Sequence, residues 1–127
     1  MTTAMLATTA NAQLKTTDET ATKQIVQSMQ DGWNTKNGNL FASRFADDCD
    51  YVVVNGMYLK SKNTVAMGHQ NIFNTFYKET SLELQLKDAR NLTDDIVVAH
   101  VTARRFGNVN GVYEDTKAII TLTLQKK

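Results

Sequence analysis

The last third of the chain constrains the fold most, because it can only be read as strands. Leu82, Leu84 and Leu86 alternate with polar residues, and residues 96–106 and 112–124 are rich in β-branched and apolar side chains. The chain contains no proline to interrupt a hydrogen-bonded ladder. Asn110-Gly111 lies between the last two runs and is a strong hairpin signal. These residues therefore predict an antiparallel meander with one buried face.

The first two-thirds of the chain show mostly helical spacing. Apolar residues recur every three or four positions over residues 17–36 and again over 62–78, with a short helix expected at 39–46 between them. Residues 51–59 form a predicted hairpin, since Asn55-Gly56 separates two apolar runs. Helices followed by long antiparallel strands predict an α+β domain with the helices on one face of a bent sheet.

Composition excludes several classes of function. The 127 residues fit one domain, and 14 basic against 13 acidic side chains give no electrostatic reason to bind nucleic acid or an anionic membrane. No apolar run is long enough to span a bilayer. Cys49 is the single cysteine and lies among aspartates, which disfavour a thiolate. We expect no disulfide, no metal site and no cofactor, because no ligand cluster or cofactor motif is present.

The amino terminus differs in composition from the rest. Residues 1–12 are rich in threonine and alanine, and Ala10-Asn11-Ala12 has the small-x-small form of a signal-peptidase site before Gln13. Two interpretations stay open: a disordered start, or the remnant of an export signal. The first places the protein in the cytoplasm and the second in an exported or periplasmic location. In both, residues 13–127 form the single domain.

Four groups of residues carry a resemblance to a known family. Trp33, Phe45-Ala46-Asp47-Asp48, Asn55-Gly56 and Gly68-His69-Gln70-Asn71-Ile72-Phe73, in this order of elements, resemble the SnoaL-like group of the nuclear-transport-factor-2-like superfamily. The chain looks closest to SgcJ/EcaC-type proteins, most of which have no known function. The resemblance implies a cone-shaped cystatin-like domain, often dimeric, whose strongly curved antiparallel sheet wraps around helices and leaves an apolar pocket at its open end.

The carboxyl terminus departs from that family pattern. Relatives usually finish with a further strand that carries a tryptophan soon after the position of Leu124, whereas this sequence stops at Lys127. Either the sequence is clipped or the domain lacks this strand. If the strand is absent, one edge of the sheet needs cover from elsewhere.

The resemblance does not extend to ketosteroid isomerase activity. Aligned from Phe45, the catalytic aspartate of that enzyme falls on Val53, and its oxyanion tyrosine falls on Met29. Neither side chain can transfer a proton. What the resemblance does imply is a small apolar ligand in a pocket lined by a set of mostly apolar and aromatic side chains: Met29, Trp33, Tyr51, Val53, Tyr58, His69 and Phe73.

His69 is the main candidate for chemistry. It shares the apolar side of its predicted helix with Val65, Ile72 and Phe76, so its ring should face the interior or the pocket. It can act as a general base near neutral pH, contact a ligand, or be a satisfied core residue. Tyr51 or Tyr58 could supply a hydrogen-bond donor. The neighbouring aspartates Asp47, Asp48 and Asp50 fit turns and helix caps better than a metal site.

Two main functional hypotheses follow. The first is a ligand-binding domain without an assigned activity, and the second is an isomerase or lyase that acts on a small apolar carbonyl compound with His69 as base. A third, an association module like that of calcium/calmodulin-dependent kinase, is disfavoured because no other domain is attached. We also expect a homodimer, because the outward strand faces are half polar and half apolar: Val98, His100, Thr102 and Arg104, with Ile119, Thr121 and Thr123 on the partner strand.

Overall fold

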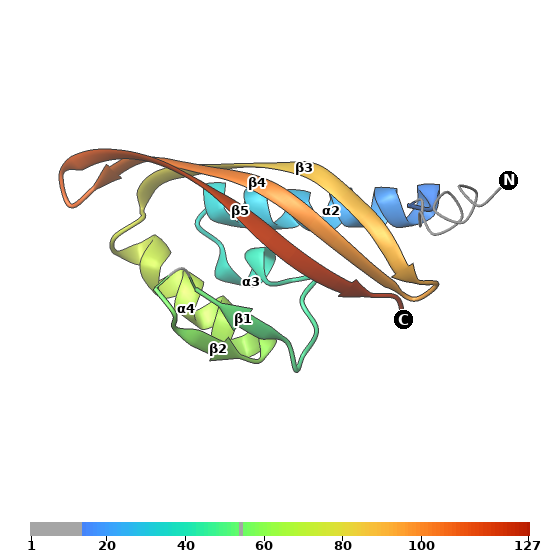
Figure 1. Ribbon diagram of the computed structural model, residues 1–127. Coiled ribbons are helices and arrows are strands. Elements are labelled where there is room, and N and C mark those ends of the chain that lie inside the picture. Colours follow the sequence, from blue (N-terminus) through green and yellow to red (C-terminus); the bar gives the residue numbers. More distant parts are fainter. Residues whose placement is uncertain (1–13, 54) are drawn as a thin grey trace, which may run out of the picture.

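The computed structural model describes residues 14–53 and 55–127, so the two interpretations of residues 1–12 lie outside the described part. Within these residues, three helices and five strands follow one another (Figure 1). In order they are α2 (Thr16–Asn34), α3 (Gly38–Phe41), β1 (Asp50–Val52), β2 (Tyr58–Lys60), α4 (Lys62–Asn74), β3 (Glu79–Thr93), β4 (Ile96–Val109) and β5 (Val112–Gln125).

The strands form two antiparallel sheets. The short pair β1–β2 is separate from the long sheet, whose order is β3-β4-β5. Asn110 and Gly111 join β4 to β5 with φ angles of 52° and 84°, as a tight hairpin turn requires. Irregularities between Leu86 and Asp88 and between Asn91 and Thr93 break the register of β3. Such bulges bend a strand, and the sheet is visibly curved (Figure 1).

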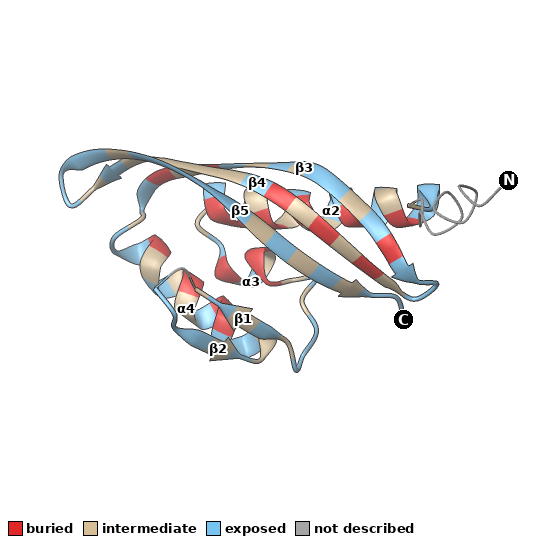
Figure 2. Cartoon of the chain, viewed as in Figure 1, coloured by how far each residue is buried: buried red, intermediate tan, exposed pale blue. Residues whose placement is uncertain are grey.

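The described helices lie on the inner side of this sheet, with α2 packed against β3 and β4 and with α3 and α4 beyond α2, which confirms the α+β prediction (Figure 1). Burial alternates along β4, where Val97, Ala99 and Val101 are buried and the residues between them are not (Figure 2). Val98 and His100, which lie between these three residues, were predicted to face outward, so the alternation agrees with the strand pattern. The hydrophobic core lies between α2, α3, α4 and the start of β3, and the buried members of its cluster are Met29, Trp33, Phe41, Ala42, Val65, Ala66, Phe73 and Leu82.

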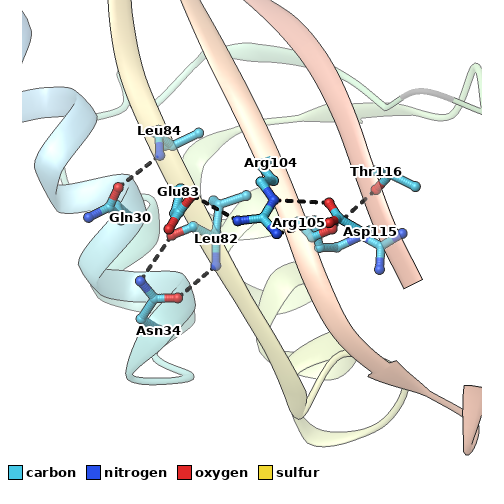
Figure 3. Close-up of polar contacts among 9 residues, drawn as sticks. All are labelled: Gln30, Asn34, Leu82, Glu83, Leu84, Arg104, Arg105, Asp115 and Thr116. Atoms are coloured by element: carbon cyan, nitrogen blue, oxygen red, sulfur yellow. Dashed lines mark hydrogen bonds and ion pairs between the residues drawn. The ribbon is translucent and has the colours of Figure 1, made fainter. Parts of the chain in front are cut away.

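Side chains of α2 cover the outer edge of β3. The Asn34 amide accepts from the Leu82 N–H at 2.8 Å and donates to the Leu82 carbonyl at 3.0 Å. Gln30 Oε1 accepts from the Leu84 N–H at 2.8 Å (Figure 3). The amides of the helix thus take the place of a neighbouring strand and satisfy backbone groups that an exposed edge leaves unpaired.

Two details of the helices differ from the sequence-based expectation. The helix expected over residues 62–78 ends at Asn74, so Phe76 is 52% exposed and does not join the apolar face. On α2, the apolar spacing over residues 17–36 predicted that the buried positions are apolar, yet Ala21 is exposed and Thr22 is buried next to it. The Thr22 hydroxyl donates to the Asp18 carbonyl at 2.7 Å, which lets a polar side chain occupy this core position.

Candidate functional site

An aromatic cluster surrounds His69 in the core. The imidazole stacks on Phe41 with ring centroids 4.0 Å apart and planes at 22°. Tyr51 meets it edge-on at 5.2 Å, and the rings of Phe73 and Trp33 lie at 6.0 and 6.3 Å. Helices α2, α3 and α4 and strand β1 each contribute to this cluster. Four elements distant in sequence therefore enclose one titratable ring.

The hydrogen bond of His69 fixes its tautomer. His69 is 5% exposed, and its Nδ1 lies 2.8 Å from the carbonyl oxygen of Val65, one turn earlier in α4. A carbonyl only accepts, so Nδ1 carries the proton and donates, and Nε2 holds the lone pair when the ring is neutral. Burial lowers the pKa of His69, and the bond to Val65 opposes this shift. The ring is therefore neutral near pH 7 and offers one acceptor at Nε2.

Tyr51 is the second polar group of the cluster. It lies in β1 opposite Leu59, and its ring also stacks on Phe45, with centroids 5.9 Å apart. Burial raises the pKa of Tyr51 to about 12. Its hydroxyl stays protonated at neutral pH and can donate a hydrogen bond. Together Tyr51 and His69 offer one donor and one acceptor without a formal charge.

The structure brings four of the expected pocket residues together and separates others. Trp33, Tyr51, His69 and Phe73 share the cluster, and Met29 belongs to the same buried core. Trp33 also donates from Nε1 to the Thr80 hydroxyl at 3.0 Å.

Tyr58 and Val53 lie outside the cluster. Tyr51 faces inward, and its cross-strand partner is Leu59. Tyr58 is the residue before Leu59 in β2, so it points to the opposite side of the β1–β2 pair. Tyr58 is consequently 53% exposed, with Lys60 Nζ 5.4 Å from its ring centroid. Val53 is half-buried, and its N–H donates to the Met57 carbonyl in the turn. Tyr58 therefore does not share a pocket with Tyr51, because successive side chains of a strand point to opposite sides.

A cleft of about 740 Å³ lies next to this cluster. It runs between the carboxyl-terminal half of β5 and the segment from α3 to β1. Its apolar wall includes Ile25, Phe45, Ile96 and Leu124. None of the residues expected to line the pocket is among its lining residues, and Phe45 stands between the cleft and the ring of Tyr51. Neither Phe41 nor Phe45 was among the residues expected to line the pocket, although Phe45 opens the Phe-Ala-Asp-Asp motif.

The outward face of the long sheet carries a separate polar group. Arg104 binds Asp115 through two hydrogen bonds, Nε to Oδ1 at 3.0 Å and Nη2 to Oδ2 at 2.8 Å, and reaches Glu83 at 3.4 Å (Figure 3). This pairing raises the pKa of Arg104 and lowers the pKa of Asp115. His100 lies on the same face, 2.7 Å from Asp88. Arg104 and His100 thus point away from the helices, as the strand alternation predicts.

The described residues hold no group of three or more histidine, cysteine or acidic side chains placed to bind a metal ion. Burial, with the nearby charge of Asp50, raises the pKa of Cys49, so its thiol stays protonated. In the part of the chain that the structure describes, no helix combines the length and apolar character needed to cross a membrane.

Comparison with solved structures identifies the fold. The sequence matches no protein-family model, and no curated protein matches it. A solved domain of unknown function with a cystatin-like fold, from Nostoc punctiforme, superposes with a TM-score of 0.81 at 27% identity, over 89% of this chain and 70% of that one. The chain has the cystatin-like fold of nuclear-transport-factor-2-like proteins.

More distant neighbours share this nuclear-transport-factor-2-like fold. A putative scytalone dehydratase from Novosphingobium aromaticivorans has a TM-score of 0.74 at 10% identity, over 87% of this chain and 75% of its own. A protein with a ketosteroid isomerase-like fold from Catenulispora acidiphila, solved in complex with trimethylamine, has a TM-score of 0.57 at 17% identity, over 81% of this chain and 75% of its own. At such identities the likeness concerns the fold alone, and it bears out the family resemblance at that level.

Proposed function

We propose that this domain binds a small, uncharged and largely apolar molecule in the cleft between β5 and the α3–β1 segment. The observation that carries the proposal is the position of Phe45, which lines the cleft and stacks on Tyr51. A ligand in the cleft therefore lies one aromatic ring away from the Tyr51–His69 pair. A volume of about 740 Å³ falls within the range usual for small-molecule sites.

The class of ligand is inferred from the apolar side of the cleft and from the two polar groups behind Phe45. The apolar wall favours an apolar body, and the Tyr51 hydroxyl and His69 Nε2 can pair with one or two neutral polar atoms once a ligand reaches past Phe45. Neither group carries a charge at neutral pH, given the directions of their pKa shifts. A small ketone or alcohol with a ring-sized apolar body fits this pattern. The neighbour that holds trimethylamine supports small-molecule binding on this fold.

Trp33 provides a direct assay, since it is the single tryptophan of the chain and its ring lies 6.3 Å from His69. Titration with a panel of uncharged aromatic and alicyclic ketones should change its fluorescence in a saturable way and raise the melting temperature. Ala46→Phe should weaken binding by filling the cleft that Ala46 lines. Ala21→Phe, on an exposed position of α2, is the matched control. Absence of saturation across the panel would argue against the proposal.

The second candidate function is an acid–base isomerase or lyase. It is favoured by the approach of His69 and Tyr51, whose rings are 5.2 Å apart, because a neutral base and a hydrogen-bond donor are the minimum for proton transfer next to a carbonyl. A neighbour described as a putative scytalone dehydratase has the same fold, which supports this second candidate. Turnover of a ketone from the panel, lost in His69→Gln, would support the enzyme; binding without turnover supports the ligand-binding domain.

The proposed domain is also a homodimer. The outward sheet face mixes apolar and polar side chains, among them Val98, Thr102 and Ile119, and suits packing against a second copy. Light scattering at micromolar concentration should give twice 14.2 kDa. A monomeric mass under these conditions would contradict the homodimer proposal but not the ligand-binding proposal.

A further inference from the structure

Two polar atoms of the aromatic cluster have no protein partner. Nδ1 of His69 donates to the Val65 carbonyl at 2.8 Å, which leaves Nε2. Among the described residues, neither Nε2 of His69 nor the hydroxyl oxygen of Tyr51 takes part in a hydrogen bond. Polar atoms in such apolar surroundings are normally paired, because an unpaired one is destabilising. Both atoms are thus available to a ligand.

These two atoms are reachable as well as unpaired. In the part of the chain that the structure describes, the one side-chain nitrogen or oxygen that is both sealed from solvent and unpaired is Nη1 of Arg105. Nε2 of His69 and the Tyr51 hydroxyl oxygen are unpaired without being sealed, although only 5% of His69 is exposed. The open part of the imidazole therefore includes the one nitrogen that can accept a hydrogen bond.

The two groups differ in the hydrogen bonds that they can make. The neutral imidazole presents only a lone pair at Nε2, because its single N–H is used within α4. The Tyr51 hydroxyl can donate its proton and can also accept. The two ring centroids are 5.2 Å apart with planes at 84°, and no hydrogen bond joins the polar atoms directly. A ligand that satisfies both atoms must supply a proton to His69 and a lone pair to the proton of Tyr51.

We propose that the ligand of this site carries an uncharged hydroxyl group, as an alcohol or a phenol, which donates to Nε2 of His69 and accepts from the Tyr51 hydroxyl. One oxygen atom can make both bonds, because a hydroxyl has one proton and two lone pairs. This inference rests on the proposed function, and it narrows the ligand class from ketones and alcohols to hydroxyl compounds.

Other small polar groups leave Nε2 without a partner. A ketone or an ether accepts from Tyr51 but has no proton to donate to the imidazole. A carboxylate has the same deficiency and also brings a charge next to the rings of Phe41, Phe73 and Trp33, where burial of a charge is costly. Sites that bind a hydroxyl through hydrogen bonds discriminate strongly against analogues that lack it, because their own polar groups are then left unpaired.

The test compares ligands that differ in this group alone. Cyclohexanol and cyclohexanone form one pair, and cyclopentanol and cyclopentanone form a second. Each alcohol should bind the wild-type protein about tenfold more tightly than its ketone, since the ketone lacks one bond and leaves Nε2 unpaired. Trp33 fluorescence measures the affinities. Nitrogen NMR of the imidazole gives a direct readout, because the Nε2 signal should move when an alcohol binds and stay in place with a ketone.

Two substitutions assign the preference to the two atoms. His69→Phe keeps an aromatic ring on Phe41 but has no lone pair, so affinity for the alcohol should fall to that for the ketone, and affinity for the ketone should not fall. Tyr51→Phe keeps the ring contacts and should weaken both ligands by about fivefold, the value of one hydrogen bond. Tyr58→Phe, at a position that is 53% exposed, is the matched control and should change neither affinity. Melting curves verify that each variant folds.

The outcomes distinguish this inference from the proposed function. Saturable binding of alcohol and ketone with equal affinity, or an unmoved Nε2 signal with a bound alcohol, would overturn the hydroxyl requirement but not the ligand-binding proposal. A preference for the alcohol that persists in His69→Phe would overturn it as well. If none of the four compounds binds saturably, the proposed function fails, and the hydroxyl requirement fails with it.

Discussion

The imidazole of His69 lies flat against the ring of Phe41, with centroids 4.0 Å apart and planes at 22°. The stack joins the short helix α3 to α4 and holds the imidazole beside Tyr51. Because Nδ1 donates its hydrogen bond to the Val65 carbonyl, Nε2 is the ring nitrogen that remains for a ligand. Stability and ligand contact therefore depend on different parts of the same side chain, and substitutions can separate them.

Replacement of His69 tests this separation. His69→Gln removes the stack, worth about 1 kcal/mol of folding stability, and changes affinity for a bound ligand by about 1 kcal/mol, the value of one hydrogen bond. His69→Phe keeps a ring on Phe41 and should lose affinity alone. If the domain is an enzyme, either variant should reduce turnover by about a hundredfold or more. Thermal melts, Trp33 titrations and turnover assays measure the three effects; unchanged affinity in both variants would assign His69 to the core alone.

The pH dependence of stability follows from the lowered pKa of His69. Between its ordinary value near 6.5 and the lowered value in the fold, the unfolded chain binds a proton that the folded chain does not. The free energy of unfolding should therefore fall as the pH drops below about 6.5, by at most about 1.4 kcal/mol per pH unit from this residue. Urea unfolding between pH 5 and 8 measures the slope. The pH dependence of the free energy of unfolding should be weaker in His69→Gln. His100→Gln, on the outward face, is the control substitution.

Two helical glycines should respond in opposite directions to alanine. A Cβ at Gly32 would overlap with the backbone nitrogen and Cα of Phe41, where α3 crosses α2. The clash should cost about 2–3 kcal/mol and outweigh the helix propensity gained. A Cβ at Gly68 would meet only Leu59 Cδ1 at 3.6 Å, an ordinary contact. Gly68→Ala should be neutral or stabilise by up to about 1 kcal/mol. Equal effects of the two substitutions in denaturant unfolding would contradict this account of the helix crossing.

The cover of the β3 edge makes a further prediction. Asn34→Ala removes both hydrogen bonds to the backbone of Leu82 and should lower the free energy of unfolding by about 1–2 kcal/mol. Gln27→Ala, on the same helix, loses only a bond to Asp31 within α2 and should change stability by less than about 0.5 kcal/mol. Hydrogen exchange of the Leu82 and Leu84 amides should become faster in the Asn34 variant. Unchanged exchange at Leu82 would show that the edge is protected in another way.

The sequence by itself determined the classes of element and which strand faces are buried. Alternation along residues 82–87 and 96–106 required strands, and the Asn-Gly pairs required turns, because these signals depend on neighbours only a few residues apart. Val97, Ala99 and Val101 are buried as predicted. Local periodicity suffices for such features, since the side-chain direction of a strand repeats every two residues.

Only the tertiary structure decided where these elements meet. Asp18, in the first turn of α2, is buried and binds Asn91 at 2.8 Å and Lys126 at 3.1 Å, partners far along the chain. Phe41 stacks on His69, and Tyr58 points away from Tyr51. Both arrangements depend on contacts between elements that are distant in sequence. No local pattern encodes such contacts, because they depend on how helices cross and which strand edge a helix covers.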